Sequence, residues 1–293
     1  MTIQILRPRS SLVVAGGAAA LLALSACGSS AGGDSLLLRG VDVDPAADSS
    51  PNDGVRLVNA GDTADRITLP IPFEEGQSAS TETVMELDMT VDGRSAGGFV
   101  DMVMTQRVTE ELAGGAEIET IFQHIEGAAV GDDLEFDDVV GVPFVSEVDA
   151  AGFPTGDLRR ADGGPMPAAL AEQLAQGNVE IDFPTEPVGA GAAWTSVAVF
   201  DSMGAQLEIE TLFELVEVDA VEYRVEITQN APIDVTVDGV DITGSIEATG
   251  TMIINRDNPL DVDTDYLQTS SASFDGIDLD LTIEVTTEST SLD

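Results

Sequence analysis

Apolar and polar residues alternate with a period of two along most of the chain after residue 80. The clearest alternation places mostly Asp, Glu or Thr, and Arg224 in one case, between apolar residues in four stretches: 85–91, 207–215, 221–227 and 277–285. Because successive side chains of a β-strand point to opposite faces, this pattern predicts strands with one buried face and one acidic, exposed face. It is typical of a mostly β fold, a curved antiparallel sheet or half-barrel, or a barrel, whose inner face is covered.

Asp-Gly pairs separate several of the predicted strands. Asp92-Gly93 and Asp238-Gly239 each follow a Thr-Val pair, and Asp-Gly is typical of tight hairpin turns. The repeated four residues are compatible with two similar β halves, residues 55–160 and 185–293.

One short helix is predicted near residues 167–176, between these halves. Pro165 and Pro167 suit a first helical turn, and good helix formers follow them. Gly177 fits the position just after a helix end. A helix of this length is sufficient to cover one side of a sheet or to close one mouth of a barrel.

The first 26 residues have the features of a secretory signal. Arg7 and Arg9 precede an apolar stretch over residues 12–24, with no acidic residue before Asp34. The apolar stretch of about 13 residues is too short for a membrane-spanning helix and suits the apolar region of a signal peptide. We therefore expect residues 1–26 to be removed from the mature chain, and no other apolar run is long enough to predict a spanning helix.

The residues that end this segment resemble a lipobox of bacterial, actinobacterial-type lipoproteins. They are Leu24-Ser25-Ala26-Cys27, followed by Gly28, and they contain the only cysteine of the chain. The resemblance implies a diacylglyceryl lipid with acyl chains such as palmitate on the Cys27 thiol, and cleavage just before it. Two acyl chains would give stable anchoring, so the resemblance implies a location on the extracytoplasmic face of the cell membrane. The alternative is an ordinary signal peptide with a chance cysteine.

Residues 27–54 form the predicted connection between the anchor and the β domain, which we expect to span residues 55–293. This segment is rich in Gly, Ser, Asp and Pro. Such a composition buries too little apolar surface to favour an ordered structure. The sequence therefore predicts a lipidated cysteine followed by a flexible acidic tether.

The charge of the chain is extreme, with a formal net charge of −43 from 54 acidic and 11 basic residues, none of them lysine. Such a charge opposes binding to nucleic acid and to anionic lipid head groups. Adaptation to a saline habitat, where salt screens the repulsion, is one explanation. A genome whose base composition favours Asp, Glu, Ala, Gly and Arg over Lys is the other.

Candidate sites for metal binding and catalysis are few. Asp257, Asp261, Asp263 and Asp265 are close in sequence and could supply oxygen ligands to Ca²⁺, but neither the glycine nor the glutamate of an EF-hand loop is in place. A solvated acidic loop is the alternative. His124 is the only histidine and lies within a predicted strand, without a nucleophile elbow in the sequence. We therefore predict no enzymatic activity.

A second resemblance rests on Pro187-Val188-Gly189-Ala190-Gly191-Ala192-Ala193-Trp194. This run is similar to a segment that precedes a strand in uncharacterised bacterial lipoproteins, and the layout resembles the β half-barrel carriers of the LolA, LppX and LprG type. The resemblance implies a curved sheet around an apolar cavity for acyl chains. Trp194 is then either a ligand-facing aromatic residue or an anchor of the core.

Together these features predict a membrane-anchored extracytoplasmic lipoprotein that acts as a binding or structural module of the cell envelope. The alternative is a carrier of a hydrophobic ligand such as a lipid. The sequence names neither an envelope protein nor a ligand as the partner.

Overall fold

The computed structural model describes residues 55–64, 66–129, 132–133, 139–150, 152, 155, 158–164, 183–202, 205–237 and 240–292. The predicted signal segment, the tether and the helix near residues 167–176 lie outside the described residues. No helix occurs within the described part, so none there is long and apolar enough to cross a membrane.

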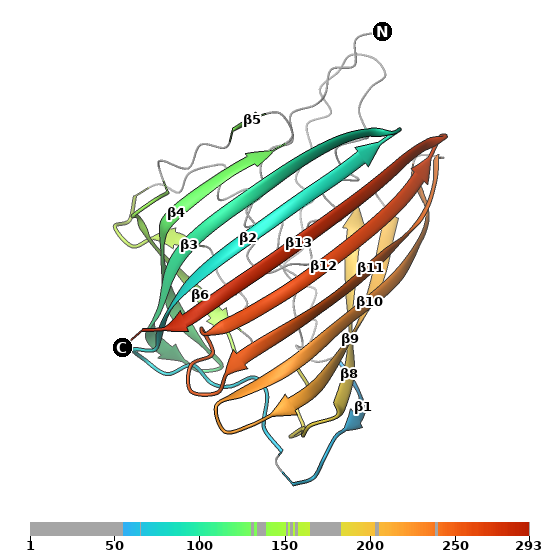
Figure 1. The fold of residues 1–293 in the computed structure, drawn as a ribbon. Helices are drawn as coiled ribbons and strands as arrows, with labels where there is room; N and C mark the ends of the chain where they lie inside the picture. Colours follow the sequence, from blue (N-terminus) through green and yellow to red (C-terminus); the bar gives the residue numbers. More distant parts are fainter. Residues whose placement is uncertain are drawn as a thin grey trace.

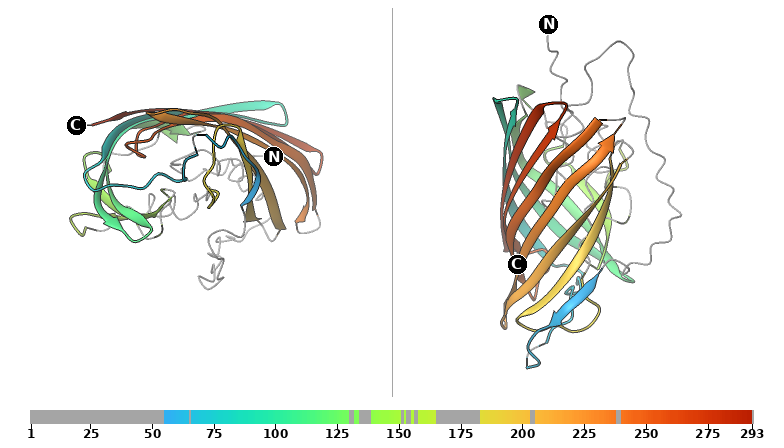
Figure 2. Two further views of the ribbon diagram at one scale, coloured as in Figure 1. Left: turned by 90° about the horizontal axis from the view of Figure 1, so that it is seen from below. Right: turned by 90° about the vertical axis from the view of Figure 1, so that its right-hand side faces the viewer.

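The described strands all belong to one antiparallel sheet, which bends into an open arc (Figures 1 and 2). In chain order they are β1 (Arg56–Ala60), β2 (Ser78–Val91), β3 (Arg94–Leu112), β4 (Gly115–Ala129), β5 (Asp132–Asp133), β6 (Pro143–Asp149), β7 (Arg159–Arg160), β8 (Ala192–Ser202), β9 (Ala205–Val218), β10 (Glu222–Val237), β11 (Val240–Asn255), β12 (Val262–Phe274) and β13 (Ile277–Ser291). The predicted curved antiparallel sheet is confirmed, and its edges do not meet.

Two runs of neighbouring strands make up the sheet. Strands β8 to β13 pair in chain order, as do β2, β3, β4 and β6, and β13 pairs with β2 to join the two runs. β1 lies at the far edge, where it pairs with the start of β8. The N-terminal strand β1 is therefore separated from β2 by the whole width of the β8–β13 run.

Two of the hairpins have turns with left-handed backbone conformation. Asp92 and Gly93 have φ values of 48° and 73°, between β2 and β3. Asp275 and Gly276 have φ values of 49° and 79°, between β12 and β13. Positive φ at both central residues matches the right-handed twist of paired strands, so these Asp-Gly pairs fix the register of long hairpins. The predicted turn at Asp92-Gly93 is confirmed, whereas Asp238-Gly239 lies outside the described residues.

A strap, described over residues 61–64 and 66–77, lies between β1 and β2 along the inner side of the arc (Figure 2). Ile67 pairs with Val188 through two backbone hydrogen bonds, of 2.7 and 2.8 Å. Ile67 and Leu69 are buried against Trp194 and its neighbours in β9 and β10. Burial of apolar area stabilises the fold, so the strap closes the core at the end of the arc near the β8–β9 strands.

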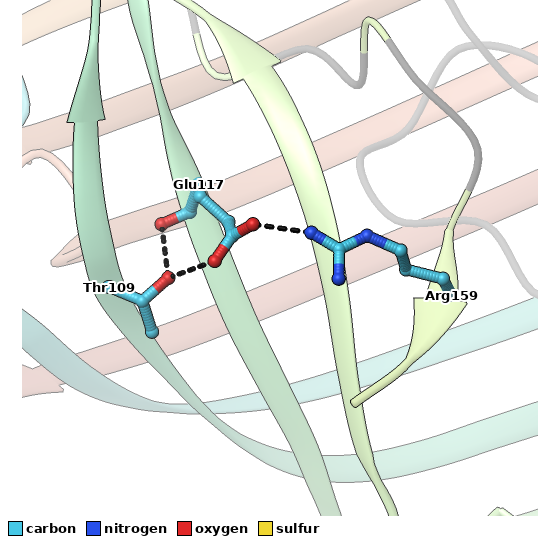
Figure 3. A network of polar contacts seen from close by, with 3 residues as sticks. All are labelled: Thr109, Glu117 and Arg159. Atoms are coloured by element: carbon cyan, nitrogen blue, oxygen red, sulfur yellow. Dashed lines mark hydrogen bonds and ion pairs between the residues drawn. The ribbon is translucent and has the colours of Figure 1, made fainter. Parts of the chain in front are cut away.

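A polar network fastens the short edge strand β7. Arg159 reaches across β6, and its Nη2 donates to Oε2 of Glu117 on β4 (Figure 3). Thr109 Oγ1 on β3 donates to Oε1 of the same carboxylate at 2.9 Å. Because the Glu117 carboxylate accepts hydrogen bonds from β3 and from β7, this network stabilises the edge of the sheet.

Candidate functional site

The concave face of the sheet carries the buried side chains and is the candidate site. The strand register brings side chains from β10, β11, β12, β13 and β2 into transverse rows on this face. One row contains Ile227, Gly250, Tyr266, Val285 and Met85; the next contains Gln229, Ala248, Gln268, Ile283 and Leu87; the third contains Ala231, Ile246, Ser270, Leu281 and Met89. Most of these side chains are apolar, and the convex face opposite them carries mostly acidic and hydroxyl side chains.

Trp194 lies in the core at the strapped end of this face. Its side chain is fully buried and stacks on Phe213, with ring centroids 5.6 Å apart and planes 13° apart. Phe183 contacts the indole with its ring centroid at 6.3 Å. The structure thus places Trp194 among apolar partners, and its Nε1 has no hydrogen-bond partner.

The concave face is less completely covered at β2, near the middle of the sheet. Met85, Leu87, Met89 and Val91 on β2 are partly buried and pack against the apolar cluster of β12 and β13. Leu279 and Leu281 on β13, directly opposite two of these residues, are each only 2% exposed. The apolar surface of β2 therefore remains partly accessible beside a closed core.

Polar side chains interrupt the apolar rows on β12. Tyr266 Oη donates to Oε1 of Gln268 at 3.0 Å, and both residues are buried. Burial raises the pKa of the Tyr266 phenol to about 12, because the surroundings disfavour its charged form. The same cause raises the pKa of Tyr223, which lies at the strapped end.

The amide nitrogen of Gln268 and the hydroxyl of Ser270 are buried without a hydrogen-bond partner. Gln268 is only 1% exposed. The two residues are two apart on one strand and share the concave face. Sequence reasoning missed them, although a polar residue at a position where the alternating pattern expects an apolar one was the available signal.

Two of the four acidic residues proposed for Ca²⁺, Asp261 and Asp263, accept hydrogen bonds through their carboxylates. Asp261 Oδ2 accepts the Ser291 hydroxyl at 2.6 Å and the Asn255 amide at 3.1 Å. Asp263 Oδ1 accepts the backbone N–H of Ser289 at 2.8 Å. These bonds tie the end of β13 to β12.

Asp257 and Asp265 do not join them in one cluster. Asp257 N–H donates to Asn255 Oδ1 in a turn, and Asp265 lies on the convex face of β12. Within the described residues, no group of three or more His, Cys, Asp or Glu side chains is arranged to hold a metal ion.

His124 lies on the convex face of β4, opposite Val103 of β3. Its Nε2 is 3.8 Å from Glu126 Oε2, and both side chains are more than half exposed. The imidazole is therefore on the opposite face from the buried rows. Cys27 lies outside the described residues.

A depression of about 390 Å³ crosses β10 to β13. Its walls include Glu226, Asp265 and Glu284, and its floor follows the row of residues that contains Tyr266. The wall residues alternate along their strands with this row, whose side chains point to the concave face. The depression therefore lies on the convex face. Its negative charge would attract cations, but no second feature there indicates a ligand.

Comparison of the chain with protein-family models, with curated proteins and with solved structures finds no match.

Proposed function

We propose that this chain is a membrane-anchored extracytoplasmic lipoprotein that acts as a binding module of the cell envelope. The observation that carries the proposal is the open, curved sheet with an apolar concave face. The edges of this sheet do not meet, whereas those of a closed, filled barrel do, so the sheet itself does not seal the concave face off from a partner. The proposed location at the membrane rests on the lipobox-like residues that end at Cys27.

The distribution of charge over the two faces of the sheet supports this proposal. Alternate residues of β13, such as Asp278, Asp280 and Glu284, point away from the concave face. Carboxylates on the convex face keep it hydrated and repel anionic head groups. The β domain would therefore stay away from the membrane that holds the N-terminus of the chain. Its proposed role there is binding rather than catalysis.

A narrower second candidate is a carrier of a hydrophobic ligand such as a lipid. The partly accessible apolar side chains of β2 favour it, because they give an apolar molecule a surface beside a closed core. Met85 and Met89 are suited to such a surface, since flexible thioether side chains adapt to ligands of different shape.

The anchor is tested with Cys27→Ala in a bacterial host that processes lipoproteins, with Ser25→Ala as the matched control. Radioactive palmitate should label the wild-type chain and Ser25→Ala, and both should sediment with membranes. Cys27→Ala should carry no label and should be released or left uncleaved. A Cys27→Ala chain that is cleaved and still sediments with membranes would contradict the anchor.

A further inference from the structure

Strand β12 places two hydrogen-bond donors without partners on the concave face, in addition to the Trp194 indole at the strapped end. Gln268 Nε2 and Ser270 Oγ lack partners, although the nearby Tyr266 hydroxyl is bonded to the other end of the same amide. If the amide of Gln268 is turned over, its nitrogen donates to the Tyr266 hydroxyl and its oxygen is left unbonded, so Ser270 Oγ is then the donor without a partner. Buried polar groups without partners are rare in folded proteins, and each needs an explanation.

The neighbours of these donors define the chemistry of what could meet them. Across the strands, Gln268 faces Ala248 and Ile283, and Ser270 faces Ile246 and Leu281. All four neighbours are buried and apolar. A molecule that reaches the donors must therefore present a hydrogen-bond acceptor on an otherwise apolar body.

The donors are also neutral. An amide and a hydroxyl stabilise a carbonyl oxygen, but they do not compensate the desolvation of a carboxylate as a guanidinium would. The strong negative charge of the chain further disfavours an anion. These two features select a neutral acceptor over an anionic one.

We propose that Gln268 and Ser270 form a donor site for the ester or amide carbonyl oxygen of a predominantly apolar molecule bound on the concave face. The inference rests on the carrier function proposed above and adds the polar group that the ligand must carry. The apolar body of the ligand lies against the half-buried side chains of β2, such as Leu87 and Met89. Gln268 belongs to the same transverse row as Leu87, and the buried Ile283 of β13 lies between them, so the donors are one strand away from that surface.

The test uses fluorescence titration of the full-length chain with three probes. They are cis-parinaric acid methyl ester, cis-parinaric acid and the hydrocarbon 1,6-diphenylhexatriene. All variants keep the same N-terminal segment, so differences between them report on the concave face. Gln268→Leu and Ser270→Ala remove the donors. Gln229→Leu is the matched control, because its amide lies in the same row and already donates to Thr211 Oγ1 at 3.5 Å.

We expect the methyl ester to bind more tightly than the free acid. Gln268→Leu should weaken ester binding about tenfold, the usual effect of one lost hydrogen bond, and should leave hydrocarbon binding unchanged. Ser270→Ala should weaken ester binding in the same direction, and Gln229→Leu should have no ester-specific effect. Ser270→Ala decides the question if Gln268→Leu fails to fold, since it removes only a hydroxyl without a partner.

Two results separate failure of the donor site from failure of the carrier function. Binding of the hydrocarbon and the ester with no ester-specific loss in either variant would overturn the donor site and leave the carrier intact. No binding of any probe to the wild-type chain would overturn both. Tighter binding of the free acid than of its ester would overturn the assignment of a neutral carbonyl.

Discussion

Removal of one negative charge from the convex face should stabilise the protein, and the effect should depend on salt. Glu284 on β13 lies directly opposite Glu86 on β2, and both side chains are exposed. Like charges in this position destabilise a sheet. Two carboxylates about 6 Å apart in water repel each other by about 0.7 kcal/mol. Glu284→Gln should therefore raise the free energy of unfolding by about 0.5–1 kcal/mol in 10 mM NaCl.

Salt should remove most of this gain. The Debye length falls from about 30 Å at 0.01 M to about 3 Å at 1 M, shorter than the separation of the two carboxylates. Glu82–Glu288 and Glu214–Glu226 are opposed in the same way, and within the described residues no cation contacts any of these carboxylates. Three such pairs predict a wild-type chain that is about 2 kcal/mol more stable in 1 M than in 10 mM NaCl.

Urea denaturation followed by circular dichroism measures these free energies. Glu247→Gln is the matched control, since Glu247 is exposed but lies opposite Asn230 and Thr269. It shares the general repulsion of the chain without a directly opposed charge, so its gain should be smaller. If both variants gain the same free energy of unfolding at low salt, or if the gain of Glu284→Gln persists in 1 M NaCl, repulsion between Glu284 and Glu86 is not its cause. A wild-type stability that is independent of salt would also remove the support for a saline habitat.

Three further perturbations test the core. Trp194→Ala should destabilise the chain by about 3–5 kcal/mol in urea denaturation, whereas Trp194→Phe should cost clearly less, because it keeps an aromatic ring against Phe213. Leu69→Ala in the strap should cost about 2–5 kcal/mol, whereas Val58→Ala, at a position that is 58% exposed, should change stability by less than about 0.5 kcal/mol; equal costs would show that the strap is not part of the core. The pKa of Tyr266 is raised to about 12 in the folded chain, above the value of about 10 expected on unfolding, so its contribution to stability is present below pH 10 and is lost as the pH rises towards 12. Absorbance at 295 nm should show no tyrosinate step near pH 10 while the chain is folded, and a step there would contradict the burial of its two tyrosines.

The strands themselves could be predicted from the sequence because one face of the sheet is buried and the other is exposed to solvent. In β13 the alternation of Leu279, Leu281 and Ile283 with acidic residues or Thr matches the observed alternation of buried and less buried side chains. Asp92-Gly93 marked a hairpin because few residue pairs tolerate two positive φ values. Local patterns of this kind depend only on neighbouring residues, so a single sequence contains them in full.

Long-range pairing could not be predicted in the same way. Nothing near β2 indicates that its second partner is β13, close to the other end of the chain. The position of β1 beside β8 and the buried strap that follows it depend equally on contacts across the fold. The alternation of Asp263 and Asp265 with Val262 and Thr264 was read as part of an acidic loop, although these residues begin β12.

The donor pair on β12 was overlooked for a different physical reason. Gln268 and Ser270 occupy inward positions in a strand that continues to Ala272 and Phe274. Polar residues at inward positions interrupt the alternation of apolar and polar residues. In the sequence alone they therefore look like a break in the strand pattern rather than part of a binding site. Only the register of the neighbouring strands shows that they are enclosed by apolar side chains.

Native mass spectrometry of the full-length chain released from bacterial membranes shows whether the concave face holds an apolar molecule. Met89 and Thr90 are neighbours on β2 that point to opposite faces, which makes Met89→Gln and Thr90→Gln a matched pair. We expect a non-covalent apolar adduct on the wild-type chain and on Thr90→Gln, and a reduced adduct on Met89→Gln. A wild-type chain without any adduct beyond the covalent lipid, or equal adducts on both variants, would contradict this expectation.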